Sequence, residues 1–368
     1  MSARRESGVA ASPDAPAVPL GGSGRRRAAI GAAWIAFGAA LIVFPVVFSN
    51  PTVTTIGVFT LVYMTSATAW NGFAGFSGYV PLGHAVFFGV GGYTLGLVAL
   101  HLNMAGGYAM FALVPLGGIA AAVIAVPFGL IALRTRRHTF VVITIAVFFI
   151  VQLLAFNLGF TQGSSGVQIP TPLWTAATFN DRFYYAALIV LALAVLVVWG
   201  IRRSRFGLQL LAIRDDEDRA RGLGVKVQRV KLVGFVLSGV TVGMAGGIYA
   251  FFVGQIYPQF AFDPLFDVTV ALMAFFGGLG TISGPLLGAL LLEPIQQYLT
   301  LQYSVGSLYL IIYGALFLVV ILAMPRGVIP TAGEYLQMRR ARRVERADGR
   351  SPAATPSVEV APLGRASR

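Results

Sequence analysis

The side chains that could do chemistry in this chain are few, and they lie far apart in the sequence. There is no cysteine, which excludes disulfide frameworks, thiolate metal sites and cysteine nucleophiles. The three histidines, His84, His101 and His138, lack the spacing of a metal-binding motif such as HExxH. No phosphate-binding loop of the form GxxxxGKS/T occurs, so the chain does not hydrolyse nucleotides by that route. The sequence therefore predicts neither an enzyme nor a bound cofactor.

A few ionisable residues fall within or beside apolar stretches. Glu293 lies in LLLEPIQQYL, and a carboxylate at membrane depth must face protein or water. We expect Glu293 to contact a solute, to carry a proton or to pair with a structural partner. His84 follows a glycine-rich run, where a lone histidine is more often a hydrogen-bonded structural residue than a proton carrier. Asp263 and Asp267 are expected at the outer end of their stretch, either in water or facing a cationic partner.

The longest charged segment between the apolar stretches is 202–231. Leucine and alanine recur in it at helical spacing, and the Gly-Leu-Gly run at 222–224 ends the pattern. The sequence therefore predicts a short amphipathic helix, which is either a solvated loop or a docking helix for a partner protein. Four of the fourteen acidic residues of the chain lie together in this segment: Asp215, Asp216, Glu217 and Asp218.

Composition identifies the elements that must position these residues. Hydrophobic residues make up 57% of the 368 positions and charged residues 11%, whereas soluble domains have roughly 45–50% and about 25%. A bilayer core about 30 Å thick needs about 20 apolar residues in a helix. The sequence predicts an all-α polytopic membrane protein with ten spans: 28–48, 52–71, 82–100, 107–133, 139–158, 183–201, 231–254, 265–282, 284–301 and 307–325.

The basic residues fall into four groups that ten spans place on one side of the membrane. These groups lie in 1–27, 134–137, 202–231 and 326–368, and they contain 26 of the 27 Lys and Arg residues. The positive-inside rule makes this side cytoplasmic and puts both termini there. The net charge of +13 is thus explained by topology, and nucleic-acid binding is not expected.

The chain is expected to divide into a transmembrane domain at 28–328 and two tails. The tail 1–27 is rich in Ala, Pro, Gly and Ser, and it is predicted to be disordered. The tail 329–368 is basic and also predicted to be disordered, with an arginine cluster suited to anionic membrane lipid. The loop 159–182, on the opposite side, is predicted to be a lid or a docking surface.

Two glycine- and proline-containing runs, GFSGYVPLG at 75–83 and GLGTISGPLLG at 278–288, interrupt apolar stretches. They are either ordinary turns or helix breaks that line a solute pathway, because unwound backbone is tolerated in a membrane where it lines a cavity. On the second interpretation, the pathway residues are Gly78, Pro81, His84, Gly278, Gly280, Pro285 and Glu293.

Several runs together resemble ABC importer permeases for branched-chain amino acids, the LivM/LivH family. GFSGYVPLGHAVFFGVGGYT (75–94) is similar to a signature of that family, and ALMAFFGGLGTISGPLLGALLL (271–292) is similar to its late glycine-rich signature. RTRRHTFVVITIA (134–146), FTQGSSGV (160–167) and SRFGLQLLAIRDDEDRARGLGV (204–225) also occur in the expected order. Tyr79-Val80-Pro81 departs from the more usual polar-Leu-Ser, and Arg219 stands where a small residue is usual.

The resemblance implies a permease subunit in the inner, cytoplasmic membrane that imports a small polar solute, such as a branched-chain or related amino acid. It further implies a second permease subunit in a heterodimer, cytoplasmic ATPase subunits and an extracytoplasmic solute-binding protein. An amide or urea importer of the same family, an ion-gradient-driven transporter and a membrane scaffold are the alternatives. The resemblance assigns ATPase coupling to Ala212, Arg214, Asp215, Asp216, Glu217, Asp218, Ala220 and Gly224.

Overall fold

The computed structural model describes residues 23–303, 311, 314–315, 318 and 327, and it divides into two units, 1–48 and 49–368. In the first unit, α1 (Ser23–Val47) contains an apolar stretch at Gly31–Val47. The tails predicted at 1–27 and 329–368 lie outside the described residues, except that α1 begins within the first of them.

Helices also dominate the second unit, which is described here by itself. Its helices are α2 (Pro51–Ser77), α3 (His84–His101), α4 (Val114–Ala132), α5 (Arg137–Asn157), α6 (Ala176–Arg203), α7 (Arg205–Asp215), α8 (Glu217–Gly222), α9 (Val227–Val253), α10 (Pro258–Ala261), α11 (Pro264–Gly277) and α12 (Ser283–Tyr303). Short 3₁₀ helices lie at Tyr108–Leu113, Gly159–Thr161 and Gly163–Ser165. Two strands, β1 (Val167–Gln168) and β2 (Gln255–Ile256), pair antiparallel with Val167 opposite Ile256.

Within the described residues, seven helical stretches are long and apolar enough to cross a membrane. They correspond to the second to eighth predicted spans, and α1 and α12 correspond to the first and ninth. The tenth, 307–325, lies outside the described residues apart from isolated positions. The all-α polytopic membrane fold is confirmed.

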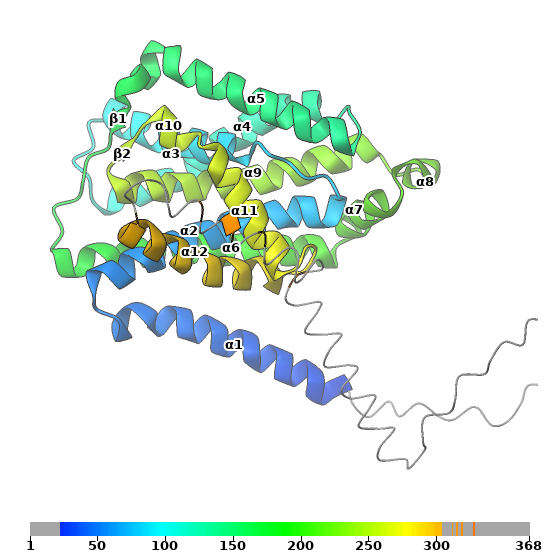
Figure 1. Cartoon of the computed structure of the whole chain (residues 1–368), viewed down its shortest axis with the longest axis horizontal. Helices are drawn as coiled ribbons and strands as arrows, with labels where there is room; N and C mark the ends of the chain where they lie inside the picture. The colour runs from blue at the N-terminus through cyan, green and yellow to red at the C-terminus, as the bar shows by residue number, and fades with distance from the viewer. Residues whose placement is uncertain (1–22, 304–310, 312–313, 316–317, 319–326, 328–368) are drawn as a thin grey trace, which may run out of the picture. The chain divides into compact units, whose positions relative to one another are not determined.

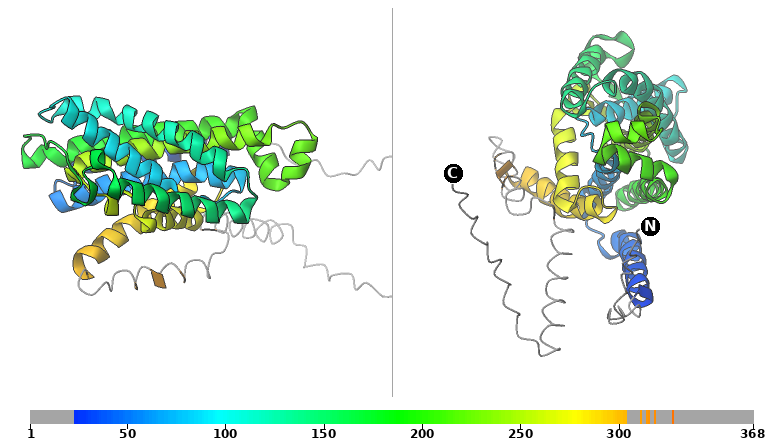
Figure 2. Two further views of the ribbon diagram at one scale, coloured as in Figure 1. Left: turned by 90° about the horizontal axis from the view of Figure 1, so that it is seen from above. Right: turned by 90° about the vertical axis from the view of Figure 1, so that its right-hand side faces the viewer.

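The second unit is organised around α9, which packs against α2, α3 and α4. Helix α2 packs in turn against α6, α11 and α12. The long helices run side by side, as Figure 2 shows in its left view. In Figure 1, α7 and α8 lie at one end of this bundle, whereas β1, β2 and α10 lie at the other.

Three glycines of α9 recur at every fourth residue, so they lie on one face of the helix, and this spacing predicts a close approach of neighbouring helices. A Cβ atom on Gly91 of α3 would lie 1.9 Å from the carbonyl oxygen of Gly243 of α9. Similarly, a Cβ atom on Gly288 of α12 would lie 1.9 Å from the carbonyl oxygen of Met273 of α11. Both contacts require glycine because no side chain fits between the two backbones.

Helix α2 is bounded by residues that suit helix ends. The side chain of Asn50 accepts a hydrogen bond from the backbone of Thr52, and Pro51 occupies the first turn. Gly78 follows the last residue with a φ of 72°, a left-handed conformation that favours glycine. The first predicted break therefore begins at Gly78 and continues to position 83, where α3 starts.

A cluster of aromatic rings packs around this break. Phe235 of α9 lies 5.2–6.2 Å, centroid to centroid, from the rings of Phe73, Phe87 and Phe140. Tyr79, in the break itself, lies 5.3 Å from Phe140 in an edge-to-face arrangement. This packing fixes the connection between α2 and α3 against the centre of the bundle.

Candidate functional site

The coupling segment, residues 202–231, contains two short helices, α7 and α8, where the sequence predicted one. Asp216 interrupts it with an extended backbone (φ −155°, ψ 109°), and its side chain accepts hydrogen bonds from the backbone N–H groups of Asp218 and Arg219, both at 3.0 Å. Asp216 thus ends α7 and caps the N-terminus of α8. Gly224 ends the segment with a φ of 85°. Periodicity alone did not predict the break, because Asp216 achieves it through a local side-chain bond.

The four acids of the segment occupy different environments. Asp215 and Asp218 are exposed, Asp216 is the cap, and Glu217 turns inward toward α9. Among the other predicted coupling residues, Ala220 is buried, Ala212 is half-buried and Gly224 is exposed. The segment therefore has an outer face of mixed charge and an inner face bound to the bundle.

Arg214 joins the coupling segment to both predicted breaks. Its Nη1 donates a hydrogen bond to the carbonyl oxygen of Gly75, near the end of α2, at 2.7 Å. A Cβ atom on Gly280 would lie 2.8 Å from that same nitrogen, and one on Gly78 would lie 3.1 Å from Cγ of Arg214. The structure thus brings Gly78 and Gly280, predicted for the pathway, together with Arg214, predicted for coupling.

Arg214, the end of α2 and the two breaks thus meet at one junction, and Asn71 of α2 also binds there. Its Oδ1 accepts a hydrogen bond from the backbone N–H of Gly280 at 2.8 Å, and its Nδ2 donates one to the carbonyl oxygen of Thr281 at 2.7 Å. Gly278 follows α11 with a φ of 123°. The second break covers 278–282, because Pro285 already lies in the first turn of α12. Sequence reasoning missed Asn71, since its partners are more than 200 positions away.

His84 begins α3 and lies in a closed environment. Its backbone N–H and that of Ala85 donate to Oδ1 of Asp267, at 2.8 and 3.1 Å. Its Nε2 lies 2.5 Å from Oγ of Ser238. Asp267 is 2% exposed and caps α3 from α11, so among the described residues it has neither of its expected surroundings, water or a cationic partner. Its position in the first turn of an apolar helix was the available signal.

The remaining predicted pathway residues lie in separate places. The carbonyl oxygen of Pro81 accepts a hydrogen bond from Nε1 of Trp70 at 2.9 Å. Glu293 is fully buried in α12, where its Oε1 accepts from Nε2 of Gln297 at 2.8 Å. Its Oε2 has no hydrogen-bond partner in the described part of the chain. Its hydrogen bond to Gln297 stays within α12 and does not join Glu293 to Arg214.

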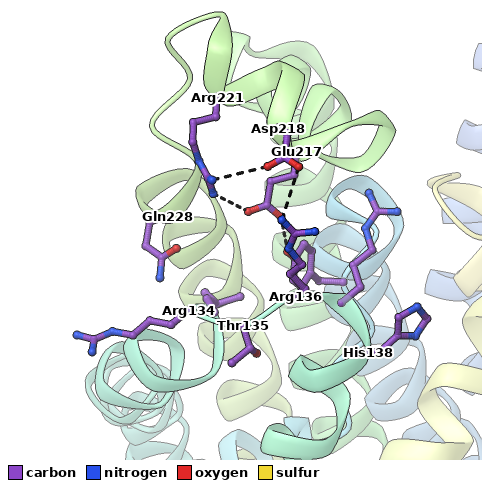
Figure 3. A pocket seen from close by; sticks show the side chains of 11 residues that line it. Arg134, Thr135, Arg136, His138, Glu217, Asp218, Arg221 and Gln228 are labelled. Carbon is purple, nitrogen blue, oxygen red and sulfur yellow. Dashed lines mark hydrogen bonds and ion pairs between the residues drawn. The ribbon is translucent and has the colours of Figure 1, made fainter.

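A cleft of about 410 Å³ opens beside α8. Figure 3 shows Glu217, Asp218 and Arg221 of α8 on one side and Arg136 opposite them. Arg136 and Arg221 each approach Asp218 at 3.7 Å, and Arg221 lies 3.2 Å from Glu217. These pairs are largely exposed, so each contributes little to stability. Within the described residues, no group of three or more acidic or histidine side chains could hold a metal ion.

Glu217 differs from the other charged residues of the cleft, because it also pairs with a buried cation. Nζ of Lys231, whose side chain is 1% exposed, lies 3.1 Å from Glu217 Oε1. The Tyr79 hydroxyl donates to Glu217 Oε2. Burial works to raise the pKa of Glu217, but the hydrogen bond from Tyr79 and the charge of Lys231 outweigh it, so that pKa lies below its ordinary value. Burial raises the pKa of Tyr79, and Glu217 raises it further.

Comparison with known proteins agrees with the family resemblance. The chain is 26% identical over 325 residues to the high-affinity branched-chain amino acid transport system permease protein LivM of Escherichia coli K12, covering 81% of this chain and 74% of LivM. It is 26% identical over 283 residues to LivH of Salmonella typhimurium, covering 73% of this chain and 91% of LivH. The fructose import permease protein FrcC of Rhizobium meliloti is 27% identical over 146 residues, covering 39% of this chain and 41% of FrcC.

No solved structure matches the chain. The family profile described as "branched-chain amino acid transport system / permease component" matches residues 52–321, from the start of α2 to beyond α12. This range covers well over half of the chain and contains both helix breaks and the segment α7–α8. The chain therefore belongs to the family of permease components of branched-chain amino acid transport systems.

Proposed function

We propose that this chain is a permease subunit of an ABC importer that moves a branched-chain or related amino acid across the cytoplasmic membrane. The observation that carries the proposal is that α7 and α8 have one face exposed and the other bound to the membrane helices. Their outer face presents the exposed acids Asp215 and Asp218. On the inner side, Arg214 binds the end of α2, and Glu217 binds both α9 and the connection between α2 and α3. Such a segment can pass a movement from a protein outside the membrane to the helices within it.

ATP hydrolysis is assigned to separate ATPase subunits, which dock on α7 and α8. The exposed acids and arginines of this segment and of the cleft beside it give a mixed-charge surface suited to a protein groove. A second permease subunit completes the membrane part as a heterodimer, in line with relatives named both LivM and LivH. Both termini and α7–α8 lie in the cytoplasm, because four basic groups share that side.

An extracytoplasmic solute-binding protein docks at the opposite end of the bundle. The loop between α5 and α6 lies at that end, where β1 pairs with β2. Arg182 packs over the rings of Tyr108 and Trp174, at 4.9 and 4.5 Å from their centroids. These contacts give the loop a defined surface, as a docking site requires.

The test is purification of the tagged chain in mild detergent, with mass spectrometry of the proteins that remain bound. The proposal expects an ATPase and a second permease, and ATP-dependent uptake of leucine-like amino acids in proteoliposomes that hold the complex and a binding protein. Competition with amides and urea tests the alternative cargo. Uptake that is lost when ion gradients are collapsed, and that continues without ATP, would overturn the proposal in favour of a gradient-driven carrier.

A further inference from the structure

A buried lysine at the start of α9 ties three separate elements together. Lys231 is 1% exposed, and a buried ammonium group is tolerated only where it is paired. Its Nζ donates to Glu217 Oε1 of α8 and to the hydroxyl oxygen of Tyr79, both at 3.1 Å. It also lies 4.2 Å from the centroid of the Tyr79 ring.

The Tyr79 hydroxyl is the part of this cluster that joins α8 to the connection between α2 and α3. It accepts a hydrogen bond from Lys231 and donates one to Oε2 of Glu217, so it acts as both acceptor and donor. Oε1 of the same carboxylate accepts from Lys231 and Arg221. Because both carboxylate oxygens are held, Glu217 cannot move without moving Tyr79 or breaking a partly buried, charge-assisted bond.

The other residues of the connection transmit the position of Tyr79 to three membrane helices. The carbonyl oxygen of Pro81 is bound by Trp70 of α2, and the N–H of Leu82 donates to Oγ1 of Thr144 of α5 at 3.1 Å. The next bonds, from the first N–H groups of α3 to Asp267, reach α11. The connection between α2 and α3 is thus bound to α8 through Tyr79, and it leads directly into the start of α3.

We infer that Glu217, Tyr79 and Lys231 form a latch that transmits the movement of α8 to α3 and α11 during transport. The inference rests on the proposed function, since it assumes that an ATPase moves α8. It assigns Tyr79 as a positioning residue, and it accounts for a tyrosine at a point where this chain departs from the family signature. Arg214 anchors the neighbouring end of α7 to α2, so the latch is a second and separate link.

The test is Tyr79→Phe in the complete complex, reconstituted with its partners in proteoliposomes. This change keeps the ring over Lys231 and the ion pair between Lys231 and Glu217, and removes only the hydroxyl. We expect the complex to assemble and hydrolyse ATP within about twofold of wild type, while amino acid transported per ATP falls about tenfold. Tyr93→Phe is the matched control, because Tyr93 is a buried tyrosine whose hydroxyl has no partner in the described region.

A second variant, Glu217→Gln, breaks the same link from its other side, at the carboxylate that the Tyr79 hydroxyl binds. It should lower transport per ATP to a similar degree, and the double variant should lose no more than either single one, because both changes break the same link. Multiplied losses in the double variant would overturn the latch, as would a parallel fall of ATP hydrolysis and transport that leaves their ratio unchanged. If wild type transports and Tyr79→Phe keeps the wild-type ratio, the latch alone is wrong. If wild type shows no ATP-driven uptake, the proposed function fails and the latch with it.

Discussion

The contribution of Asp267 to the stability of the fold can be tested directly by substitution. Its Oδ1 accepts two backbone N–H groups at the start of α3, while its Oδ2 has no hydrogen-bond partner in the part of the chain described. Asp267→Ala would leave both buried N–H groups without an acceptor, and each such loss costs about 1–3 kcal/mol. The two losses together should lower the free energy of unfolding by about 2–6 kcal/mol, more than for an ordinary exposed cap.

Asp267→Asn separates the hydrogen bonds from the charge. The amide keeps an oxygen that can accept from the same two N–H groups, and it removes a carboxylate whose burial is costly. It also loses the attraction between a negative charge and the N-terminus of α3. Because these two changes oppose each other, we expect the free energy of unfolding to stay within about 1 kcal/mol of wild type.

The measurement is reversible unfolding in mixed micelles as the fraction of denaturing detergent rises, followed by circular dichroism. Asp263→Ala is the control, because Asp263 caps α11 through one bond to the N–H of Leu265, at 2.9 Å, and is only half-buried. It should cost about 1 kcal/mol. The reasoning is refuted if Asp267→Ala costs no more than Asp263→Ala, or if Asp267→Asn costs as much as Asp267→Ala.

Three further changes probe other parts of the structure. Gly91→Ala should destabilise the fold by about 1–3 kcal/mol, because the new Cβ atom has no room. Gly200→Ala is the control and should cost nothing, because open space surrounds that position. Equal unfolding curves for the two variants would contradict this reasoning. Since the pKa of Glu217 lies below its ordinary value of 4.5, its stabilisation should persist at neutral pH and be lost as pH falls through the folded-state pKa. The difference in melting temperature between wild type and Glu217→Gln should thus hold from pH 7 to about 5, and its loss near pH 6 would refute that pKa shift. Glu293→Gln should leave ATP-driven uptake largely intact, while abolished uptake would favour a gradient-driven carrier.

Features encoded by local pattern were predictable from the sequence. Apolar length gave the membrane helices, and glycine spacing in α9 predicted the close packing that Gly243 makes with α3. Glycine and proline runs located both connections, although the second extends only over 278–282. Each of these features depends on residues within one or two helical turns, so no distant partner needs to be known.

Features that depend on distant partners were not predictable. His84 and Asp267 are 183 positions apart, and Asn71 and Thr281 are 210 apart. Lys231 looked like one more cytoplasmic cation in a basic segment, yet it is almost fully buried because Glu217 and Tyr79 fold over it. Sequence shows that such residues are polar, but only the packing of helices shows whether water or protein surrounds them.

The acidic run of the coupling segment shows why this distinction matters for function. As a sequence, Asp215 to Asp218 is one patch of charge, and a single docking role for all four acids is the natural prediction. In the structure, Asp216 caps α8 and Glu217 binds Lys231, so only Asp215 and Asp218 are exposed. Replacing all four residues together would disturb a helix start and the ion pair of a buried lysine as well as the outer surface. Docking of a partner and transmission of its movement therefore belong to different residues of one short run. Variants of Asp215 and Asp218 alone would test docking without disturbing the internal contacts of Asp216 and Glu217.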